Sequence, residues 1–300
     1  MKPLLIVNPV SGQTRPNDNC NALIDQLPLD AGGVVITDGP GVARKASFDA
    51  AFSEINYDSL WIAGGDGTVN EAINGLQDAV ARGGKRLPLG IVPRGTQNVL
   101  AFELGLPHSD VLASAQMLKA QRTRTIDLGM ADGRYFSLMA GFGFDAAVVD
   151  GVERPIKELI GPAAYAFATL GTLARYRSTR MRLTLDGETT HTDAYLVVVA
   201  NAASYAYRQI KLAPFATLDD GWLDVCVFER APSDRVGFAT QIMAVLARRH
   251  LRDPRVRYYR AREIEIISEP AIHGQLDGER SGQTPVNIRI MPGAIDLIVP

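Results

Sequence analysis

The 300-residue sequence has few residues of the types that form disulfides or bind metals, with two cysteines and four histidines. Cys20 and Cys226 each lie in or near an apolar stretch, which favours free buried thiols in a reducing cytoplasm over a disulfide. The histidines show no spacing typical of metal ligands. Basic and acidic residues nearly balance, giving a net charge of −2, which argues against a protein whose whole surface binds nucleic acid.

Long hydrophobic runs are also missing. The longest uncharged stretch, residues 159–174, contains glycine and proline, and it falls short of the roughly 20 residues that a membrane-spanning helix needs. The apolar run at the start is too short for a signal peptide. We therefore expect a cytoplasmic protein that is soluble or attached only transiently to the inner face of a membrane.

The pattern of the first 125 residues is that of an α/β domain. Short apolar strands follow one another, and helical segments lie between them, including 18–27 and 43–55. Continuous rather than alternating hydrophobicity is typical of a parallel sheet covered on both faces. The expected strands are 4–7, 33–37, 60–63 and 89–92. The sequence therefore predicts a doubly wound α/β domain over residues 1–125.

After residue 125 the pattern changes. Several predicted strands alternate polar with apolar residues, as half-exposed antiparallel strands do, and Asp-Gly turns at 132–133 and 186–187 separate some of them. Helical stretches near 156–176 and 233–249 interrupt the strands. We expect a β-rich second domain of sandwich type over residues 126–290.

The segment 64–68, Gly-Gly-Asp-Gly-Thr, is the most informative part of the chain. It joins a predicted buried strand to a helix. Glycines let the backbone approach an oxyanion, and the first turn of a helix offers unpaired N–H groups and a positive dipole end. Asp66 places a carboxylate there, which repels phosphate unless a cation or a proton transfer is involved. The combination indicates phosphoryl chemistry with Mg²⁺; the alternative is a tight turn with Asp66 as N-cap.

Other candidate loops also follow predicted strands, namely 8–12, Thr37 and 93–98. Open α/β sheets bind ligands at the carboxyl ends of their strands, so these loops should converge. Residues 90–96 have P-loop spacing but lack the lysine that a P-loop needs, which excludes that motif. Residues 141–146 match a dinucleotide-binding pattern, but no βαβ unit surrounds them.

Taken in order, these segments resemble the catalytic region of the diacylglycerol kinase family, which includes bacterial soluble lipid kinases and the sphingosine and ceramide kinases. NAD kinases share the Gly-Gly-Asp-Gly turn and are more distantly similar. The matching segments cover nearly the whole chain: 8–12, 64–68, 93–98, 127–129, 141–146, 220–224 and 277–279. The resemblance implies an ATP-dependent lipid kinase with its active site in an interdomain cleft, and a last segment, 291–300, that returns to the first domain.

The resemblance also implies roles for individual residues. Glu279 is expected to be the general base that takes a proton from the acceptor hydroxyl, and Asp66 to hold catalytic Mg²⁺ or orient that hydroxyl. The expected nucleotide-binding residues are Asn8, Pro9, Val10, Ser11, Gly12, Thr37, Gly65, Asp66, Gly67, Thr68, Val69, Asn70, Glu71 and Thr96.

Two acidic turns could each have either a functional role or only the structural role of an ordinary β-turn. The turn before residue 223 suits a hard cation, although an ordinary β-turn explains it equally well. The resemblance implies a structural Mg²⁺ bound by the Asp220 side chain and the backbone carbonyls of Thr217 and Trp222. The sequence Asp-Gly-Glu occurs twice, at 186–188 and 277–279, and only the second copy has the position of the family's catalytic one.

The acceptor remains open among diacylglycerol, a sphingoid base or ceramide, and phosphatidylglycerol. Val99 stands where many diacylglycerol kinases carry aspartate, which favours the sphingosine and ceramide version. Arginines concentrated over 248–262 form either a contact for anionic membranes or a solvated basic stretch. The alternatives to a lipid kinase are a soluble phosphotransferase similar to NAD kinase and a catalytically silent nucleotide-binding regulator.

Overall fold

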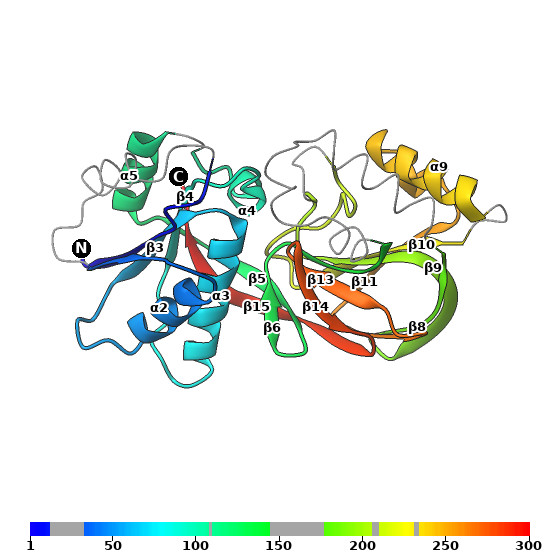
Figure 1. The fold of residues 1–300 in the computed structure, drawn as a ribbon, viewed down its shortest axis with the longest axis horizontal. Coiled ribbons are helices and arrows are strands. Elements are labelled where there is room, and N and C mark those ends of the chain that lie inside the picture. The colour runs from blue at the N-terminus through cyan, green and yellow to red at the C-terminus, as the bar shows by residue number, and fades with distance from the viewer. Residues whose placement is uncertain (13–32, 108–109, 145–176, 206–209, 231–233) are drawn as a thin grey trace. The chain divides into compact units, whose positions relative to one another are not determined.

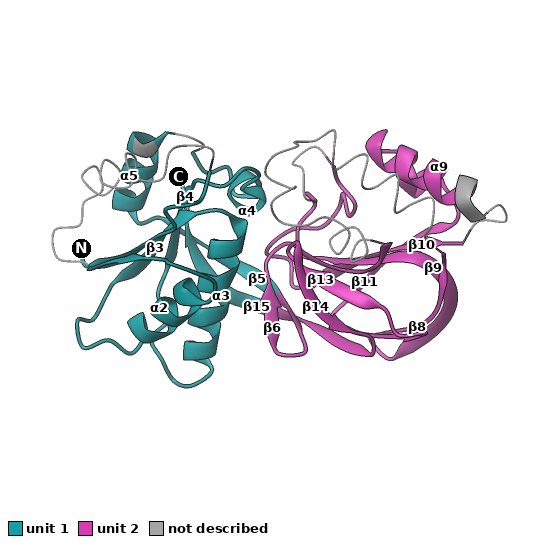
Figure 2. Cartoon of the chain, in the orientation of Figure 1, with its two compact units in different colours: residues 1–128, 292–300 teal, residues 129–291 magenta. Residues whose placement is uncertain are grey.

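The computed structural model describes residues 1–12, 33–107, 110–144, 177–205, 210–230 and 234–300 (Figure 1). Two compact units divide the chain (Figure 2). Unit 1 comprises Met1–Leu128 and Pro292–Pro300, and unit 2 comprises Gly129–Met291. None of the helices within the described ranges is long and apolar enough to cross a membrane.

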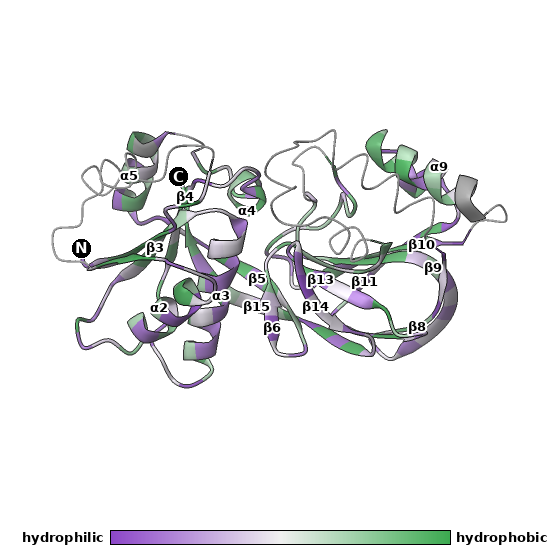
Figure 3. Ribbon diagram, viewed as in Figure 1, coloured by the Kyte–Doolittle hydropathy of each residue, from purple (hydrophilic) through white to green (hydrophobic). Residues whose placement is uncertain are grey.

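Unit 1 contains a parallel sheet with the order β4-β3-β1-β2. Its strands are β1 (Pro3–Val7), β2 (Gly33–Ile36), β3 (Ser59–Gly64) and β4 (Leu89–Pro93). Every residue of β1, β3 and β4 is buried, which is the reason for their continuous apolar sequences. Figure 3 shows the hydrophobic colour along β3. The predicted α/β fold is confirmed.

The helices of unit 1 lie between the strands in the sequence. They are α2 (Val42–Ala50), α3 (Asp66–Val80), α4 (Val99–Glu103) and α5 (Val111–Ala120). Helix α2 is shorter than the predicted segment 43–55, because the chain turns after Ala50 and Asn56 adopts a left-handed conformation with φ of 54°. The predicted helix at 18–27 lies outside the described residues, as does Cys20.

The last residues of the chain belong to unit 1. The end of β15 (Val286–Ile298) pairs with β4 in parallel through Leu297 and Leu89. The Gly293 N–H donates to the Asp127 carboxylate at 2.7 Å, and Arg86 forms two hydrogen bonds with Asp296. These contacts fasten a segment that is distant in sequence to the sheet of unit 1.

Unit 2 is built from antiparallel strands. They are the end of β5 (Thr123–Ala131), β6 (Arg134–Phe136), β7 (Met139–Gly143), β8 (Thr179–Leu185), β9 (Glu188–Ala200), β10 (Leu223–Glu229), β11 (Val256–Ala261), β12 (Glu263–Glu269), β13 (His273–Leu276), β14 (Glu279–Gln283) and the start of β15. The first half of β9 pairs with β8, and its second half pairs with β7 and β10. One long strand thus joins several neighbours, and the predicted β-rich domain is confirmed.

Three Asp-Gly pairs close hairpins in unit 2. They are Asp132-Gly133, Asp186-Gly187 and Asp277-Gly278, and both residues of each pair have positive φ values, between 45° and 89°. Type I′ turns require this conformation at both central positions, and aspartate and glycine adopt it at low cost. The predicted turns at 132–133 and 186–187 are therefore present.

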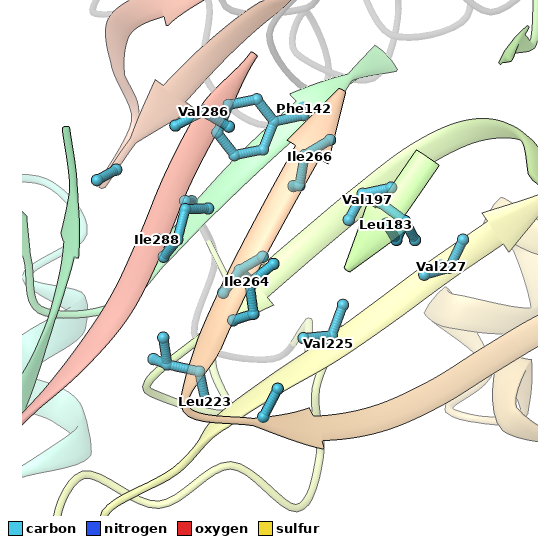
Figure 4. Close-up of a cluster of buried hydrophobic side chains, with 14 of the residues drawn as sticks. Phe142, Leu183, Val197, Leu223, Val225, Val227, Ile264, Ile266, Val286 and Ile288 are labelled. Carbon is cyan, nitrogen blue, oxygen red and sulfur yellow. The ribbon is translucent and has the colours of Figure 1, made fainter. Parts of the chain in front are cut away.

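Strand β10 and the second half of β9 are buried on both faces because each face is covered. Val197 and Val199 of β9 lie in one buried cluster with residues of β8, β10, β12 and β15 (Figure 4). Val198 points to the other side, where Phe238 of α9 (Asp234–Leu246) packs in a second buried cluster. Cys226 lies in this second cluster as a free thiol whose pKa burial raises to about 12, so the thiol stays protonated. The predicted helix near 156–176 lies outside the described residues.

His250, in the short helix η1 (His250–Arg252), belongs to the same side of the sheet. This residue is 2% exposed, its ring stacks on Phe228, and Nε2 donates to the Leu212 carbonyl at 3.0 Å. Among the described residues Nδ1 has no hydrogen-bond partner. A proton on Nδ1 would be buried without an acceptor, and desolvation lowers the pKa of His250 below 6.5.

This histidine should make folding sensitive to acid. Since the pKa is lower in the folded state, the unfolded state binds the proton more readily below pH 6.5, and the free energy of unfolding falls by at most about 1.4 kcal/mol per pH unit. H250Q, which keeps a donor for Leu212, should reduce the difference in unfolding free energy between pH 7.5 and pH 5.5 in urea titrations. H191Q, at an exposed position of β9, is the control. An unchanged difference in H250Q would contradict this prediction.

Candidate functional site

The loops after β1, β3 and β4 of unit 1 contact one another. The Asn8 side chain donates to Thr68 Oγ1 at 2.9 Å and accepts from the Val10 N–H at 3.1 Å. The Arg94 N–H donates to the Gly64 carbonyl at 2.9 Å. Three segments that are far apart in the sequence therefore form one group, as predicted for the carboxyl ends of parallel strands.

Glycines permit this close approach. A Cβ on Gly95 would lie 2.6 Å from the Gly65 Cα and 2.8 Å from Asn98 Oδ1. A Cβ on Gly12 would lie 2.5 Å from the Arg94 carbonyl oxygen, and Gly12 has φ of 96°. The backbones of the three loops are thus packed against one another, and any other residue at position 95 would separate them.

The start of helix α3 lies within this group of loops. Its N-cap is Gly65, in an extended conformation, and no side chain caps it. The Asp66 carboxylate instead accepts the N–H of Val99, the first residue of α4, at 2.8 Å. The alternative in which Asp66 is the N-cap of its own helix is therefore wrong. An uncapped first turn of a 15-residue helix favours anion binding through its N–H groups and dipole.

The predicted nucleotide-binding residues fall into two groups. Those on the loop surface are exposed or half-buried: Asn8, Pro9, Val10, Ser11, Gly12, Gly65, Asp66, Gly67 and Thr96. The others pack into the unit or hold its loops. Val69 is 5% exposed, the Asn70 side chain accepts from Asn74, and Glu71 accepts the N–H of Gly41 at 2.8 Å. Thr68, which accepts from Asn8, and Thr37 are buried.

The sequence analysis did not identify the structural role of Asn98. Its side chain accepts the Gly95 N–H at 2.8 Å and donates to the Gly95 carbonyl at 2.6 Å, and its backbone has φ of 47°. Asparagine is one of the few residues that adopt this left-handed conformation readily. Its place after Gly-Thr-x, before a helix, is a local signal that indicates such a turn.

Glu279 is the first residue of β14 in unit 2. The preceding Asp277 anchors its hairpin, because this carboxylate accepts the backbone N–H groups of Ser137, Leu138 and Met139 at 2.7–3.0 Å and the Ser137 hydroxyl at 3.0 Å. Gln275 accepts the Gly278 N–H at 2.6 Å. The second Asp-Gly-Glu copy differs in its surroundings, since Asp186 holds the N–H groups of Arg262 and Glu263 and Glu188 is exposed.

Arg134 contacts Glu279 and was also missed by the sequence analysis. Its Nη2 atom lies 2.6 Å from Glu279 Oε2, and both side chains are about one third exposed. The two residues are 145 positions apart, and the only local signal is that Arg134, like Glu279, follows an Asp-Gly turn.

The Asp220 turn has an internal cation. One oxygen of the Asp220 carboxylate accepts the Trp222 N–H at 3.1 Å, and the other pairs with Arg260. Arg260 also lies over the Trp222 ring and 3.8 Å from the buried Asp224 carboxylate. A metal ion held by Asp220 with the carbonyls of Thr217 and Trp222 would share this carboxylate with Arg260 or displace it. The described part of the chain contains no group of three or more His, Cys, Asp or Glu side chains able to hold a metal.

Much of the basic stretch 248–262 is neutralised by neighbouring acids. Arg255 pairs with Asp253 at 2.7 Å, and its hydrogen bonds hold the pKa of Asp253 below the usual value. Arg257 pairs with Glu229 at 3.3 Å. The positive charge of this stretch is therefore smaller than the sequence indicates.

Comparisons with known proteins cover both units. A family model described as the diacylglycerol kinase catalytic domain matches residues 2–131. A second model, the YegS C-terminal NAD kinase beta sandwich-like domain, matches residues 139–299.

Individual relatives of this chain are named diacylglycerol kinases. A diacylglycerol kinase of Staphylococcus saprophyticus is 32% identical over 257 residues, which are 85% of this chain and 81% of the relative. One from Bacillus subtilis is 31% identical over 82% of this chain and 78% of its own length. The crystal structure of a diacylglycerol kinase from Bacillus anthracis matches all of this chain and 97% of its own, with a TM-score of 0.79 and 26% identity.

The glycine contact leads to a stability prediction. G95A should lower the free energy of unfolding by roughly 1–3 kcal/mol, because the added methyl group overpacks the contact between the loops. G39A, whose Cβ would meet nothing within 4 Å, is the control. Urea titrations of both variants measure the effect, and equal stabilities of the two would refute the importance of the contact.

The Asp220–Arg260 pair leads to a metal prediction. R260Q removes the internal cation, so MgCl₂ should raise the melting temperature of R260Q more than that of the wild type. At a hundred times the dissociation constant, bound Mg²⁺ should add about 2.7 kcal/mol to the free energy of unfolding of R260Q. R257Q is the matched control, because Arg257 lies on β11 like Arg260 and its substitution breaks an ion pair with Glu229 of β10. If MgCl₂ stabilises wild type and R260Q equally, Arg260 does not compete with a cation.

Proposed function

Because the chain belongs to the diacylglycerol kinase family, we propose that it is an ATP-dependent lipid kinase, which transfers the γ-phosphoryl group of ATP to a hydroxyl group of a membrane lipid. The observation that carries the proposal is the uncapped start of helix α3 among glycine-containing loops, together with Glu279 on an anchored hairpin. The first feature suits phosphate binding, and the second supplies a carboxylate for proton transfer.

On the nucleotide side, the N–H groups at the start of α3 and the loops 8–12 and 93–98 bind the phosphates. Asp66 orients the reacting groups, and its half-buried carboxylate is a suitable ligand for a hard cation. Bound Mg²⁺ would supply positive charge that neutralises the phosphate oxygens. The bond between Asp66 and Val99 fixes the direction of the carboxylate.

On the acceptor side, Glu279 acts as the general base. The lipid hydroxyl oxygen attacks the γ-phosphorus, the bond from phosphorus to the ADP oxygen breaks, and the hydroxyl proton passes to Glu279. A hydroxyl group is a poor nucleophile at neutral pH, and a positioned base typically contributes 10²–10⁴-fold to such a transfer. Phosphoryl transfer otherwise depends on positioning and on charge neutralisation.

We propose diacylglycerol as the acceptor. The relatives described above are named diacylglycerol kinases, and the argument from Val99 for a sphingoid acceptor is weakened by its burial. Its side chain is 3% exposed and its N–H is bound to Asp66, so packing of α4 accounts for an apolar residue there. Soluble acceptors such as NAD, and a catalytically silent regulator, are the competing functions.

Membrane contact is part of this proposal. Met243 and Leu246 of α9 are 63% and 57% exposed, and Arg249 and Arg252 follow them in the chain. Apolar side chains beside basic ones suit the interface of an anionic bilayer, where each basic residue contributes about 1 kcal/mol. The arginines further along the stretch have acidic partners and contribute less.

The test is transfer of labelled phosphate from Mg·ATP into diacylglycerol, ceramide, sphingosine and phosphatidylglycerol in mixed micelles, with NAD as a soluble acceptor. Wild type should label diacylglycerol, and E279Q should be at least roughly 10²-fold slower because the base is lost.

E188Q is the matched control, since Glu188 occupies the same place in the other Asp-Gly-Glu hairpin and is exposed. It should react at the wild-type rate. Label in NAD alone would favour the soluble phosphotransferase, and binding of ATP without any labelled product would favour the regulator. Full activity of E279Q would remove Glu279 as the base.

A further inference from the structure

One guanidinium group, that of Arg134, binds both the Glu279 side chain and the backbone of the next residue. Arg134 Nη2 donates to Glu279 Oε2 at 2.6 Å, and Nη1 donates to the backbone carbonyl of Arg280 at 3.0 Å. The planar fork of arginine therefore spans the Glu279 side chain and the backbone that follows it. This arrangement restrains the rotation of the glutamate side chain relative to its own strand.

Two hairpin turns of the same type present the pair. Arg134 follows Asp132-Gly133 and begins β6, while Glu279 follows Asp277-Gly278 and begins β14. All four turn residues have positive φ values, so the backbones that lead into both side chains are fixed by type I′ geometry. Glu188 follows the third such turn and is exposed, so the turn alone does not create the pair.

The two carboxylate oxygens of Glu279 have different environments. Oε2 is bound to Arg134, whereas Oε1 has no hydrogen-bond or ion-pair partner within the described parts of the chain. A base needs one oxygen with an open lone pair and a fixed direction. The pair provides this division, with one oxygen anchored and the other available to accept a proton.

A purely structural role is a poor explanation for Arg134. The hairpin that carries Glu279 is already fastened by the bonds of Asp277 to Ser137, Leu138 and Met139. The ion pair is about one third exposed, and such pairs contribute little to stability. What Arg134 adds is control over the direction of the Glu279 carboxylate.

We propose that Arg134 is a positioning residue for the general base, acting through Glu279 and not on the substrates. This proposal rests on the proposed function, because it requires Glu279 to be the base. It identifies a second residue, outside all the sequence motifs, on which the rate of phosphoryl transfer depends.

The experiment compares R134Q and R134K with wild type, using Mg·ATP and the micellar lipid that wild type labels. R134Q should lower kcat by at least roughly tenfold, since small misplacements of reacting groups have large effects, while KM for ATP stays within about twofold. R134K, which keeps the charge but loses the fork, should fall between wild type and R134Q. Melting temperatures should be close to that of wild type for both.

R182Q is the matched control. Arg182 also pairs with a glutamate in unit 2, Glu265, at 3.7 Å and with partly exposed side chains. If removal of any such ion pair lowered the rate through loss of structure, R182Q would do so as well. Wild-type kcat in R182Q, with reduced kcat in R134Q, supports a specific effect on Glu279.

Two further measurements separate acting through Glu279 from acting directly. In the E279Q background, R134Q should cause no additional loss of rate, because there is no base left to position. Added guanidinium ion should restore part of the activity of R134A. An additional loss in the double variant would show that Arg134 touches the substrates and would overturn the proposal.

The failures of the two proposals are distinguishable. Wild-type kcat in R134Q together with a slow E279Q overturns the role of Arg134 and leaves the proposed function intact. Full activity of E279Q, or no labelled product with wild type, overturns the assignment of the base and the positioning role with it.

Discussion

The contact between the backbones of Gly65 and Gly95 determines how the candidate phosphate-binding loops of unit 1 are built. It brings the loops after β3 and β4 together so closely that a single methyl group on Gly95 would lie 2.6 Å from the opposite Cα atom. The Asp66 carboxylate reaches the N–H of Val99 across the same contact. No side chain caps the start of helix α3, so its first N–H groups suit an anion.

Turns of identical conformation have different surroundings in unit 2 because their neighbours differ. The Asp-Gly sequence closes three hairpins with the same backbone conformation. Its aspartate binds different N–H groups each time: those of residues 137–139 for Asp277, those of residues 262–263 for Asp186 and that of Asn287 for Asp132. Of the two glutamates that follow such a turn, Glu279 is paired with an arginine from another hairpin, whereas Glu188 is exposed.

Several arginines of unit 2 are paired with acidic side chains. The arginines of β11 and its flanks bind Asp253, Glu229 and Asp220, so a stretch that is strongly basic in sequence has a smaller free charge. The same principle pairs Arg260 with Asp220, the carboxylate expected to bind a structural metal ion. A guanidinium group and a divalent cation neutralise the same carboxylate, and a local arginine is always present at high effective concentration.

The sequence by itself determined the features that depend on local interactions. Continuous apolar runs predicted the buried parallel strands of unit 1, alternating runs predicted several of the strands of unit 2, and Asp-Gly pairs predicted hairpins, because burial and backbone conformation act within a few residues. The candidate residues of the loops after β1, β3 and β4 also came from local patterns. Only the tertiary structure decided which side chains meet: Asp66 with Val99, Asp220 with Arg260 and Glu279 with Arg134, which is 145 positions away. Such pairs depend on strand order and packing, and no local pattern of residues records them.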